Sequence, residues 1–293
     1  MHINLSGLFV LLCLFVFSPL VGQAQSSRSA TRPATFALSR IDTISSTILG
    51  ENRVLNVYLP DGYSPDSATK YPVIYLLDGG VDEDFVHIVG LVMYNTTPWI
   101  NRFPQSIVVG IGNVNRRRDF TFTVPNLDFV AQTGFDKSQY SAYGGSAKFI
   151  AFLEQEVQPF IDKRYASSKA RTIIGESLAG LLATEILLKK PALFDTYIIM
   201  SPSLWWGQES LLYDAPRLLA AKGRNPVNVY IGACEKTTSL RMYADAKALS
   251  DIVTKHGAGK ARVYFDYLPD ETHATLIHQS VYNAFKLLYP LKK

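Results

Sequence analysis

The chain has 293 residues, of which 47% are apolar and 18% are charged, a balance typical of a globular protein and unlike that of a disordered one. Its 29 basic and 25 acidic residues give a formal net charge of +4, too small an excess to indicate nucleic-acid binding. With 2 cysteines it can form neither a disulfide framework nor a thiolate zinc site.

The N-terminal segment predicts an export signal. Residues 8–17 form an uncharged apolar run that is too short to span a bilayer but has the length of a signal-peptide core. The small residues that end at Ala24 predict cleavage there, so that 1–24 is a signal peptide and 25–35 a flexible leader. We then expect a periplasmic or extracellular protein without stable membrane insertion. A signal peptide usually begins with a basic segment, but the residues before this apolar run include His2 and no Lys or Arg. An uncleaved membrane anchor is therefore the alternative.

Short apolar runs alternate with longer stretches of helical periodicity, which predicts a single α/β domain over residues 36–293. The runs Thr43–Ile48 and Val54–Leu59 flank a turn at residues 50–52 and predict an antiparallel hairpin. The remaining predicted strands form a mainly parallel sheet and are Val73–Leu77, Ile107–Ile111, Thr172–Ile174, Thr196–Met200, Val227–Ile231 and Val263–Tyr267.

Helices are predicted between these strands, on both faces of the sheet. The helix at Ala147–Tyr165 contains Pro159, which we expect to kink it. The long irregular stretch Asn113–Ser146 predicts a lid or a binding loop. The other predicted helices are Leu178–Lys190, Ser239–His256 and Ala274–Tyr289.

The segment TIIGESLAG places a serine on a tight turn between a predicted strand and a predicted helix. Gly175 and Ala179 are small residues two positions either side of Ser177, and such neighbours permit the strained backbone of a nucleophile elbow. Ala179 replaces the second glycine of the G-x-S-x-G pattern, and a purely structural turn is the alternative. In an elbow, the N–H of Leu178 at the helix start is the first donor of an oxyanion hole.

A second oxyanion donor is expected in the loop after the strand Val73–Leu77. Gly79 and Gly80 lie in this loop, where backbone without side chains can approach a substrate closely. We predict that the N–H of Gly80 or Val81 is this donor. An ordinary strand-ending turn would also explain two glycines.

The general base is expected after the last strand, because the chain order in this architecture is serine, acid, histidine. His273 lies in the loop after that strand and is our candidate. His256 and His278 lie in or at the end of predicted helices, where a solvated or capping role is expected. His87 lies in the helix after Gly79 and Gly80, where we expect a buried or surface histidine and a pocket-lining role is the alternative.

The acid is expected in the loop after Val227–Ile231, where Glu235 is the first carboxylate. It would hold the tautomer of His273 and stabilise the imidazolium. Asp270 and Glu271 are alternatives, but residues so close in sequence seldom point at the histidine ring.

Several segments together resemble the putative-esterase family of α/β hydrolases: YPVIYLLDGG, GGSAKFIAFLEQEVQPFIDKRY, GESLAG, SPSLWW and the late E-T-H segment. The resemblance extends from Ile44 to Leu288 and is strongest to the branch of siderophore esterases. The family also includes relatives of S-formylglutathione hydrolase and feruloyl esterases. The resemblance implies an α/β-hydrolase fold, with Ser177 as nucleophile, His273 as base and Glu235 as acid, although some siderophore esterases use a serine and histidine pair.

These features predict an exported serine esterase that cleaves a carboxylic ester of a small molecule through an acyl-enzyme, without a metal or cofactor. An acyltransferase on the same fold is one alternative, since the same triad can pass the acyl group to an alcohol. A non-catalytic binding protein on this fold is another. The sequence does not indicate an oligomeric state.

The substrate hypothesis is a siderophore or another aromatic ester. Trp205 and Trp206 follow a strand on the edge that carries Ser177, and they either form a pocket wall for an aromatic acyl group or pack beneath the long loop. The run Arg116–Arg118 offers guanidinium groups to an anionic substrate, with Arg118 as the candidate, and a solvated basic turn is the alternative.

Overall fold

The structure is a computed structural model that describes residues 36–66, 68–220, 226–237, 239–257 and 259–291. Residues Ala37–Lys293 form one compact unit. The predicted signal peptide and leader lie outside the described residues. Within the described ranges, no helix has both the length and the apolar character that crossing a membrane requires.

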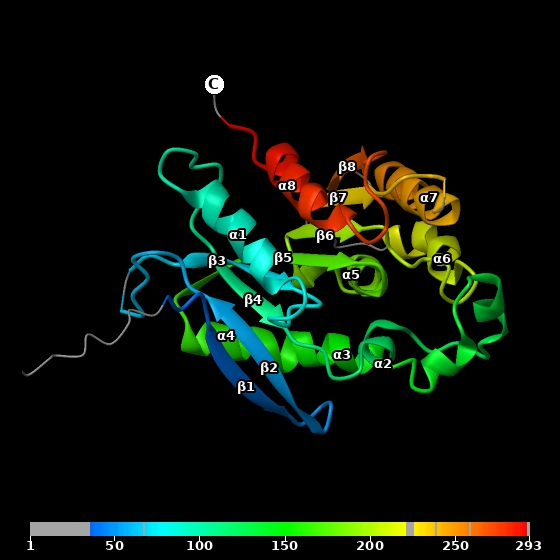
Figure 1. Cartoon of the computed structure of the whole chain (residues 1–293), viewed down its shortest axis with the longest axis horizontal. Coiled ribbons are helices and arrows are strands. Elements are labelled where there is room, and N and C mark those ends of the chain that lie inside the picture. The colour runs from blue at the N-terminus through cyan, green and yellow to red at the C-terminus, as the bar shows by residue number, and fades with distance from the viewer. Residues whose placement is uncertain (1–35, 67, 221–225, 238, 258, 292–293) are drawn as a thin grey trace, which may run out of the picture. The chain divides into compact units, whose positions relative to one another are not determined.

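One sheet of eight strands forms the centre of this unit (Figure 1). The strands are β1 (Arg40–Ser46), β2 (Glu51–Tyr58), β3 (Tyr71–Leu76), β4 (Ile107–Ile111), β5 (Ser167–Glu176), β6 (Thr196–Met200), β7 (Val227–Ala233) and β8 (Ala261–Tyr267). Their order is β1-β2-β4-β3-β5-β6-β7-β8. β2 pairs antiparallel with β1 and with β4, and the other neighbours pair in parallel. The predicted mainly parallel sheet with an antiparallel N-terminal hairpin is therefore confirmed.

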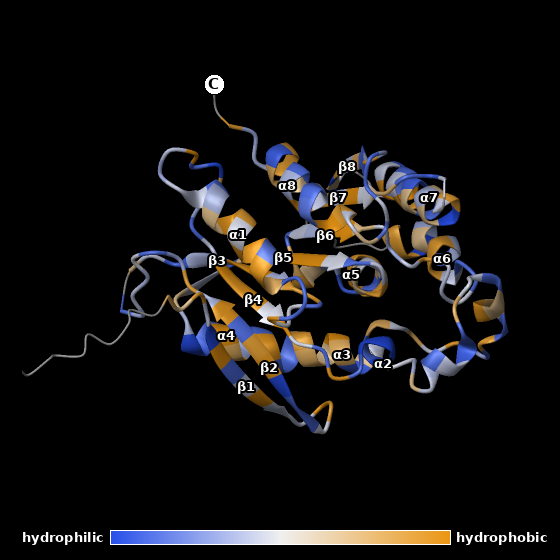
Figure 2. Cartoon of the chain, viewed as in Figure 1, coloured by the Kyte–Doolittle hydropathy of each residue, from blue (hydrophilic) through white to orange (hydrophobic). Residues whose placement is uncertain are grey.

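Helices cover both faces of the sheet, as predicted. They are α1 (Phe85–Thr96), α2 (Arg116–Phe120), α3 (Ser146–Phe152), α4 (Gln158–Arg164), α5 (Leu178–Lys189), α6 (Ser210–Leu219), α7 (Leu240–His256) and α8 (Leu276–Leu288). Figure 2 shows central strands that are largely hydrophobic and helices that are hydrophobic on one side and hydrophilic on the other. This pattern is typical of a sheet that is buried on both faces.

Alternating side chains along the central strands build two apolar layers. In β3, Val73 and Tyr75 belong to the layer that contains residues of α3 to α7. Ile74 and Leu76 belong to the layer that contains residues of α1 and α8. The sheet is thus covered on both faces, which leaves its edges for a site, and in open α/β sheets ligands bind outside the carboxyl ends of the strands.

The predicted helix at residues 147–165 contains an irregularity. A π-helical turn, η3 (Leu153–Val157), joins α3 to α4, and Pro159 lies in the first turn of α4. A proline inside a regular helix removes one N–H and collides with the carbonyl four residues earlier. The irregularity that we expected at Pro159 is therefore a π-helical turn just before it.

Two predictions about irregular regions were incomplete. The stretch 113–146 contains α2 and two 3-10 turns, η1 (Asp128–Gln132) and η2 (Lys137–Tyr140). Helix α6 was not predicted, because its sequence contains Pro216. It begins after Glu209, whose positive φ of 55° is unfavourable for a residue with a side chain. Packing of its apolar residues Leu211 and Ala215 against the core outweighs these unfavourable local signals.

Candidate active site

Ser177 lies on a strained turn between β5 and α5, at the carboxyl edge of the sheet. Its φ of 58° and ψ of −119° are rare for a residue with a side chain. A Cβ on Gly175 would lie 2.6 Å from the carbonyl oxygen of Ala179, so glycine is required there. The Ser177 N–H donates to the carbonyl of Met200 on β6 at 3.0 Å, which ties the turn to the neighbouring strand.

His273 reaches this serine from the loop between β8 and α8. Its Nε2 lies 3.1 Å from Ser177 Oγ. Burial, together with the positive charge of Arg116, lowers the pKa of His273 below its ordinary value. The ring is therefore neutral near pH 7 and can accept a proton from the serine hydroxyl.

Ser203 is a second hydroxyl beside the nucleophile candidate, and our sequence reasoning missed it. Its Oγ lies 3.2 Å from Ser177 Oγ, and its N–H donates to the carbonyl of Ser177 at 2.9 Å. The available signal was the segment SPSLWW, which directly follows β6 and thus ends at the same edge of the sheet.

The structure does not bring the expected acid to His273. The Glu235 carboxylate accepts from the backbone N–H of Thr237, and the Glu235 N–H donates to the carbonyl of Glu271 at 2.9 Å. The alternative Glu271 carboxylate accepts from the Thr275 hydroxyl at 2.6 Å. Nδ1 of His273 is buried and has no hydrogen-bond partner among the described residues. The Glu235 carboxylate thus binds the backbone of its own loop, and no carboxylate of the described residues forms a hydrogen bond with Nδ1 of His273.

Gly79 serves packing in this structure. Its N–H donates to the carbonyl of Ile111 at 3.0 Å. A Cβ at this position would lie 2.3 Å from the Cα of Gly110 in β4, a contact that no side chain permits. Because its N–H is already engaged, Gly79 is not available as an oxyanion donor.

Three backbone N–H groups remain as candidates for an oxyanion hole, those of Leu178, Gly80 and Val81. Leu178 is the first residue of α5, so its N–H has no acceptor within the helix. The N–H of Gly80 donates to Glu83 Oε2 at 2.7 Å. An anionic oxygen therefore already occupies the position at which Gly80 would bind a substrate oxygen. Val81, the other candidate, is 56% exposed.

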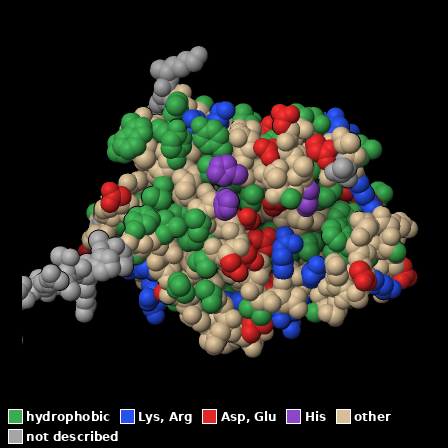
Figure 3. Space-filling model, viewed as in Figure 1, with side chains coloured by type: hydrophobic (Ala, Val, Ile, Leu, Met, Phe, Trp, Pro, Cys, Tyr) green, Lys and Arg blue, Asp and Glu red, His purple; other side chains and the backbone are tan. Residues whose placement is uncertain are grey.

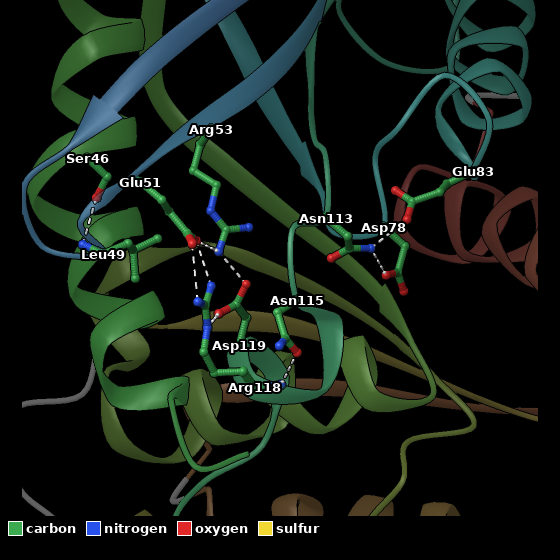
Figure 4. Close-up of polar contacts among 10 residues, drawn as sticks. All are labelled: Ser46, Leu49, Glu51, Arg53, Asp78, Glu83, Asn113, Asn115, Arg118 and Asp119. Carbon is green, nitrogen blue, oxygen red and sulfur yellow. Dashed lines mark hydrogen bonds and ion pairs between the residues drawn. The ribbon is translucent and has the colours of Figure 1, made fainter. Parts of the chain in front are cut away.

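A polar network connects this loop to the serine. The Arg116 guanidinium donates to both carboxylate oxygens of Asp78, at 2.7 and 2.8 Å, and to the carbonyl of Glu176 at 3.4 Å. Asn113 Nδ2 lies between Asp78 and Glu83, 2.6 Å from an oxygen of each (Figure 4). The side chains of α2 and of the segment before it thus fix the loop that carries Gly80.

Carboxyl groups near the serine have raised pKa values. Burial and the charges of Asp84 and Asp78 raise the pKa of Glu176 to about 8, although Arg116 opposes the change. Burial and Asp78 raise the pKa of Asp84 to about 6. Figure 3 shows acidic side chains beside basic ones near the middle of the face in view. Within the described ranges, no three His, Cys, Asp or Glu side chains are arranged to hold a metal ion.

Arg118, which we expected to offer its charge to a substrate, is paired with carboxylates of the protein instead. It binds Glu51 at 2.6 Å and Asp119 at 2.7 Å, and the buried Arg53 pairs with the same two carboxylates (Figure 4). These four charges attach α2 to β2. The guanidinium that reaches the serine turn is that of Arg116.

The two tryptophans pack beneath the long segment 113–146. Trp205 is 3% exposed and Trp206 is fully buried. Trp206 Nε1 donates to the carbonyl of Phe122 at 2.8 Å, and Trp205 stacks on Phe135 with ring centroids 5.5 Å apart. Of the two roles that the sequence allowed for these tryptophans, packing beneath the loop is therefore the observed one, and they do not form an open pocket wall.

Comparison with known proteins shows that most of this chain is similar to esterases. The model of the family described as "Putative esterase" matches residues 46–274. The ferri-bacillibactin esterase BesA of Bacillus subtilis is 30% identical over 257 residues, which cover 82% of this chain and 86% of that protein. A siderophore enterobactin esterase of Emericella nidulans is 33% identical over 108 residues, 36% of each chain.

Solved structures are similar as well. An IroE-like serine hydrolase from Shewanella oneidensis has a TM-score of 0.78 and 27% identity, over 86% of this chain and 80% of that one. The BES protein from Bacillus cereus has a TM-score of 0.75 and 24% identity, over 89% and 99%. The second likeness concerns the fold alone.

Proposed function

Because this chain belongs to the putative-esterase family and is a carboxylic ester hydrolase, we propose that Ser177 is its nucleophile and His273 its general base. The observation that carries the proposal is the 3.1 Å contact between Ser177 Oγ and His273 Nε2, on a backbone turn that only small neighbours permit. A strained residue that presents its hydroxyl to a neutral imidazole is the arrangement that nucleophilic catalysis requires.

The reaction then has two halves. Ser177 Oγ attacks the ester carbonyl carbon while His273 Nε2 takes the hydroxyl proton, and the imidazolium returns that proton to the leaving alcohol. Water attacks the resulting acyl-enzyme, His273 takes the water proton, and the acid product leaves as the Ser177 hydroxyl reforms. His273 performs both proton transfers from one position.

In this proposal the histidine works without a hydrogen-bonded carboxylate. Nδ1 of His273 has no partner among the described residues, and the neighbouring Arg116 disfavours the imidazolium. The protonated ring is therefore short-lived and a strong acid toward the leaving alcohol. Glu235, whose carboxylate is held by Thr237, has no direct part in this scheme.

The oxyanion is bound by the N–H groups of Leu178 and Gly80. The charge that develops on the carbonyl oxygen needs donors that are already oriented. Gly80 donates to a carboxylate oxygen of Glu83 in this structure, which supports its orientation toward a negatively charged oxygen. The substrate oxygen takes the place of this carboxylate, and Glu83 turns outward.

We further propose that the substrate is a siderophore ester or a related aromatic ester. The names of BesA and of the Emericella nidulans relative describe siderophore esterases. The Arg116 side chain, 36% exposed beside the serine turn, offers a positive charge to an anionic substrate. A panel with a catecholate trilactone, a neutral aromatic ester and a short aliphatic ester tests this choice, and a preference for the aliphatic ester contradicts it.

Two variants test the roles of the dyad. Ser177→Ala and His273→Ala should each reduce ester hydrolysis by at least about a thousandfold with folding intact, as in other serine hydrolases. His278→Ala is the matched control, because His278 lies on the exposed side of α8. Substantial activity in Ser177→Ala contradicts the proposal.

Finally, we propose that the protein is exported and cleaved after Ala24. The apolar run at residues 8–17 supports this proposal. N-terminal sequencing of the protein from the periplasm or the medium should begin at Gln25. Retention of residues 1–24 on a cytoplasmic protein contradicts it.

A further inference from the structure

We propose that Ser203 is a third catalytic residue, whose hydroxyl donates a hydrogen bond to Ser177 Oγ and stabilises the negative charge that forms there during attack. This inference rests on the proposed role of Ser177. It adds a residue that neither the elbow pattern nor the triad order predicts.

Three side chains in the site are connected by two hydrogen-bond contacts. Ser203 Oγ lies 3.2 Å from Ser177 Oγ, which in turn lies 3.1 Å from His273 Nε2. A serine hydroxyl offers one donor and two acceptor sites. When Ser177 donates its proton to the imidazole, its lone pairs are free to accept from Ser203.

The burial of Ser203 makes this contact effective. The residue is 2% exposed, so water does not compete for its hydroxyl. Hydrogen bonds are stronger away from water, and hydrogen bonds that are linked to one another polarise and strengthen each other. The gain is largest when the acceptor gains negative charge, and the Ser177 oxygen does so as its proton moves to His273 during the attack.

The site has a particular need for such a donor. In a complete triad, a carboxylate stabilises the imidazolium that forms when the histidine takes the serine proton. Here Nδ1 of His273 has no partner among the described residues, and Arg116 disfavours the positive ring. Ser203 instead stabilises the negative charge that builds up on the serine oxygen during the same proton transfer.

The backbone and the side chain of Ser203 have separable roles. Its N–H holds the carbonyl of Ser177 at 2.9 Å, and an alanine at this position keeps that bond. Loss of the hydroxyl alone therefore tests the chemical role and leaves the turn in place. Ser201 is the matched control, because its hydroxyl is also fully buried in the same segment but contacts Cys234 Sγ at 3.2 Å.

The experiment measures the second-order rate constant for reaction with a fluorophosphonate, together with kcat and KM for an ester. A hydrogen bond to a charged group contributes about 1.5–3 kcal/mol, so Ser203→Ala should lower the fluorophosphonate rate constant and kcat about 10- to 150-fold. KM, the melting temperature and the apparent pKa of His273 in the pH profile should be unchanged. Ser201→Ala should react at the wild-type rate.

The outcomes separate this inference from the proposed function. A wild-type reaction rate in Ser203→Ala, with Ser177→Ala inert, overturns the role of Ser203 and leaves the nucleophile intact. Labelling and hydrolysis by Ser177→Ala overturn the proposed function itself. If Ser203→Ala does not fold, Ser203→Cys decides, because its thiol is a weak donor of similar shape: a reduced rate supports the inference and a wild-type rate refutes it.

Discussion

The carboxylate of Glu83 occupies one arm of the proposed oxyanion hole, so its removal should make the enzyme faster. The Gly80 N–H donates to Glu83 Oε2 at 2.7 Å, and the substrate oxygen must displace this contact. A hydrogen bond to a charged group contributes about 1.5–3 kcal/mol, but Glu83 is partly exposed and water replaces much of that loss. We take about 1 kcal/mol as the barrier that remains, which corresponds to about a fivefold increase in kcat/KM for Glu83→Ala.

The assay compares kcat/KM of Glu83→Ala, Glu83→Gln and the wild type on one neutral ester. The glutamine still accepts from Gly80 but without a charge, so its rate should lie between the other two. Asp82→Ala controls for the removal of a nearby negative charge, since Asp82 is an exposed neighbour on the same loop. Asn113 keeps its contact with Asp78 in all variants. A rate for Glu83→Ala that is unchanged or lower, with an unchanged melting temperature, refutes the reasoning.

Three further predictions concern charge, stability and specificity. The pKa of Glu176 in the folded protein is about 8, above the ordinary value of 4.5, so between these values the folded protein keeps a proton that the unfolded chain loses. The free energy of unfolding should therefore fall as the pH rises from about 4.5 to 8. Glu176→Gln should show a flatter dependence on pH in urea titrations across this range. Trp206→Ala removes a fully buried ring and its bond to Phe122, and should lower the free energy of unfolding by about 3–5 kcal/mol, whereas a loss below about 1 kcal/mol would mean that the segment 113–146 does not depend on this ring. Arg116→Ala should reduce kcat/KM for an anionic ester about tenfold more than for a neutral one, and Arg118→Ala should leave that ratio unchanged; equal effects of Arg116→Ala on both esters would exclude it from substrate recognition.

The sheet and the serine turn were predictable because their signals are local in the sequence. A strand buried on both faces is a continuous apolar run, as in Thr196–Met200, where the predicted and observed limits agree. The turn at Ser177 needs small neighbours at fixed positions, and the fold brings the later loop with His273 to the same edge. Chain order alone thus placed two distant residues together.

The remaining contacts depend on how loops close, which sequence patterns do not encode. Glu235 stands at the expected position along the chain, but its carboxylate accepts from the backbone N–H of Thr237, and Nδ1 of His273 has no partner among the described residues. Arg116 and Arg118 are two positions apart on α2, yet the direction of each guanidinium follows from which carboxylate lies within reach. The contact between Ser203 and the nucleophile arises in the same way, from a turn that returns to the edge of the sheet.

The central claim is that Ser177 forms the acyl-enzyme, and trapping that intermediate tests it most directly. The wild type is mixed with an excess of a slowly hydrolysed aromatic ester, quenched in acid, digested and mapped by mass spectrometry. The account predicts the mass of the acyl group on the peptide that contains Ser177, and none in Ser177→Ala. An acyl group on another residue, or full turnover by Ser177→Ala, would contradict it.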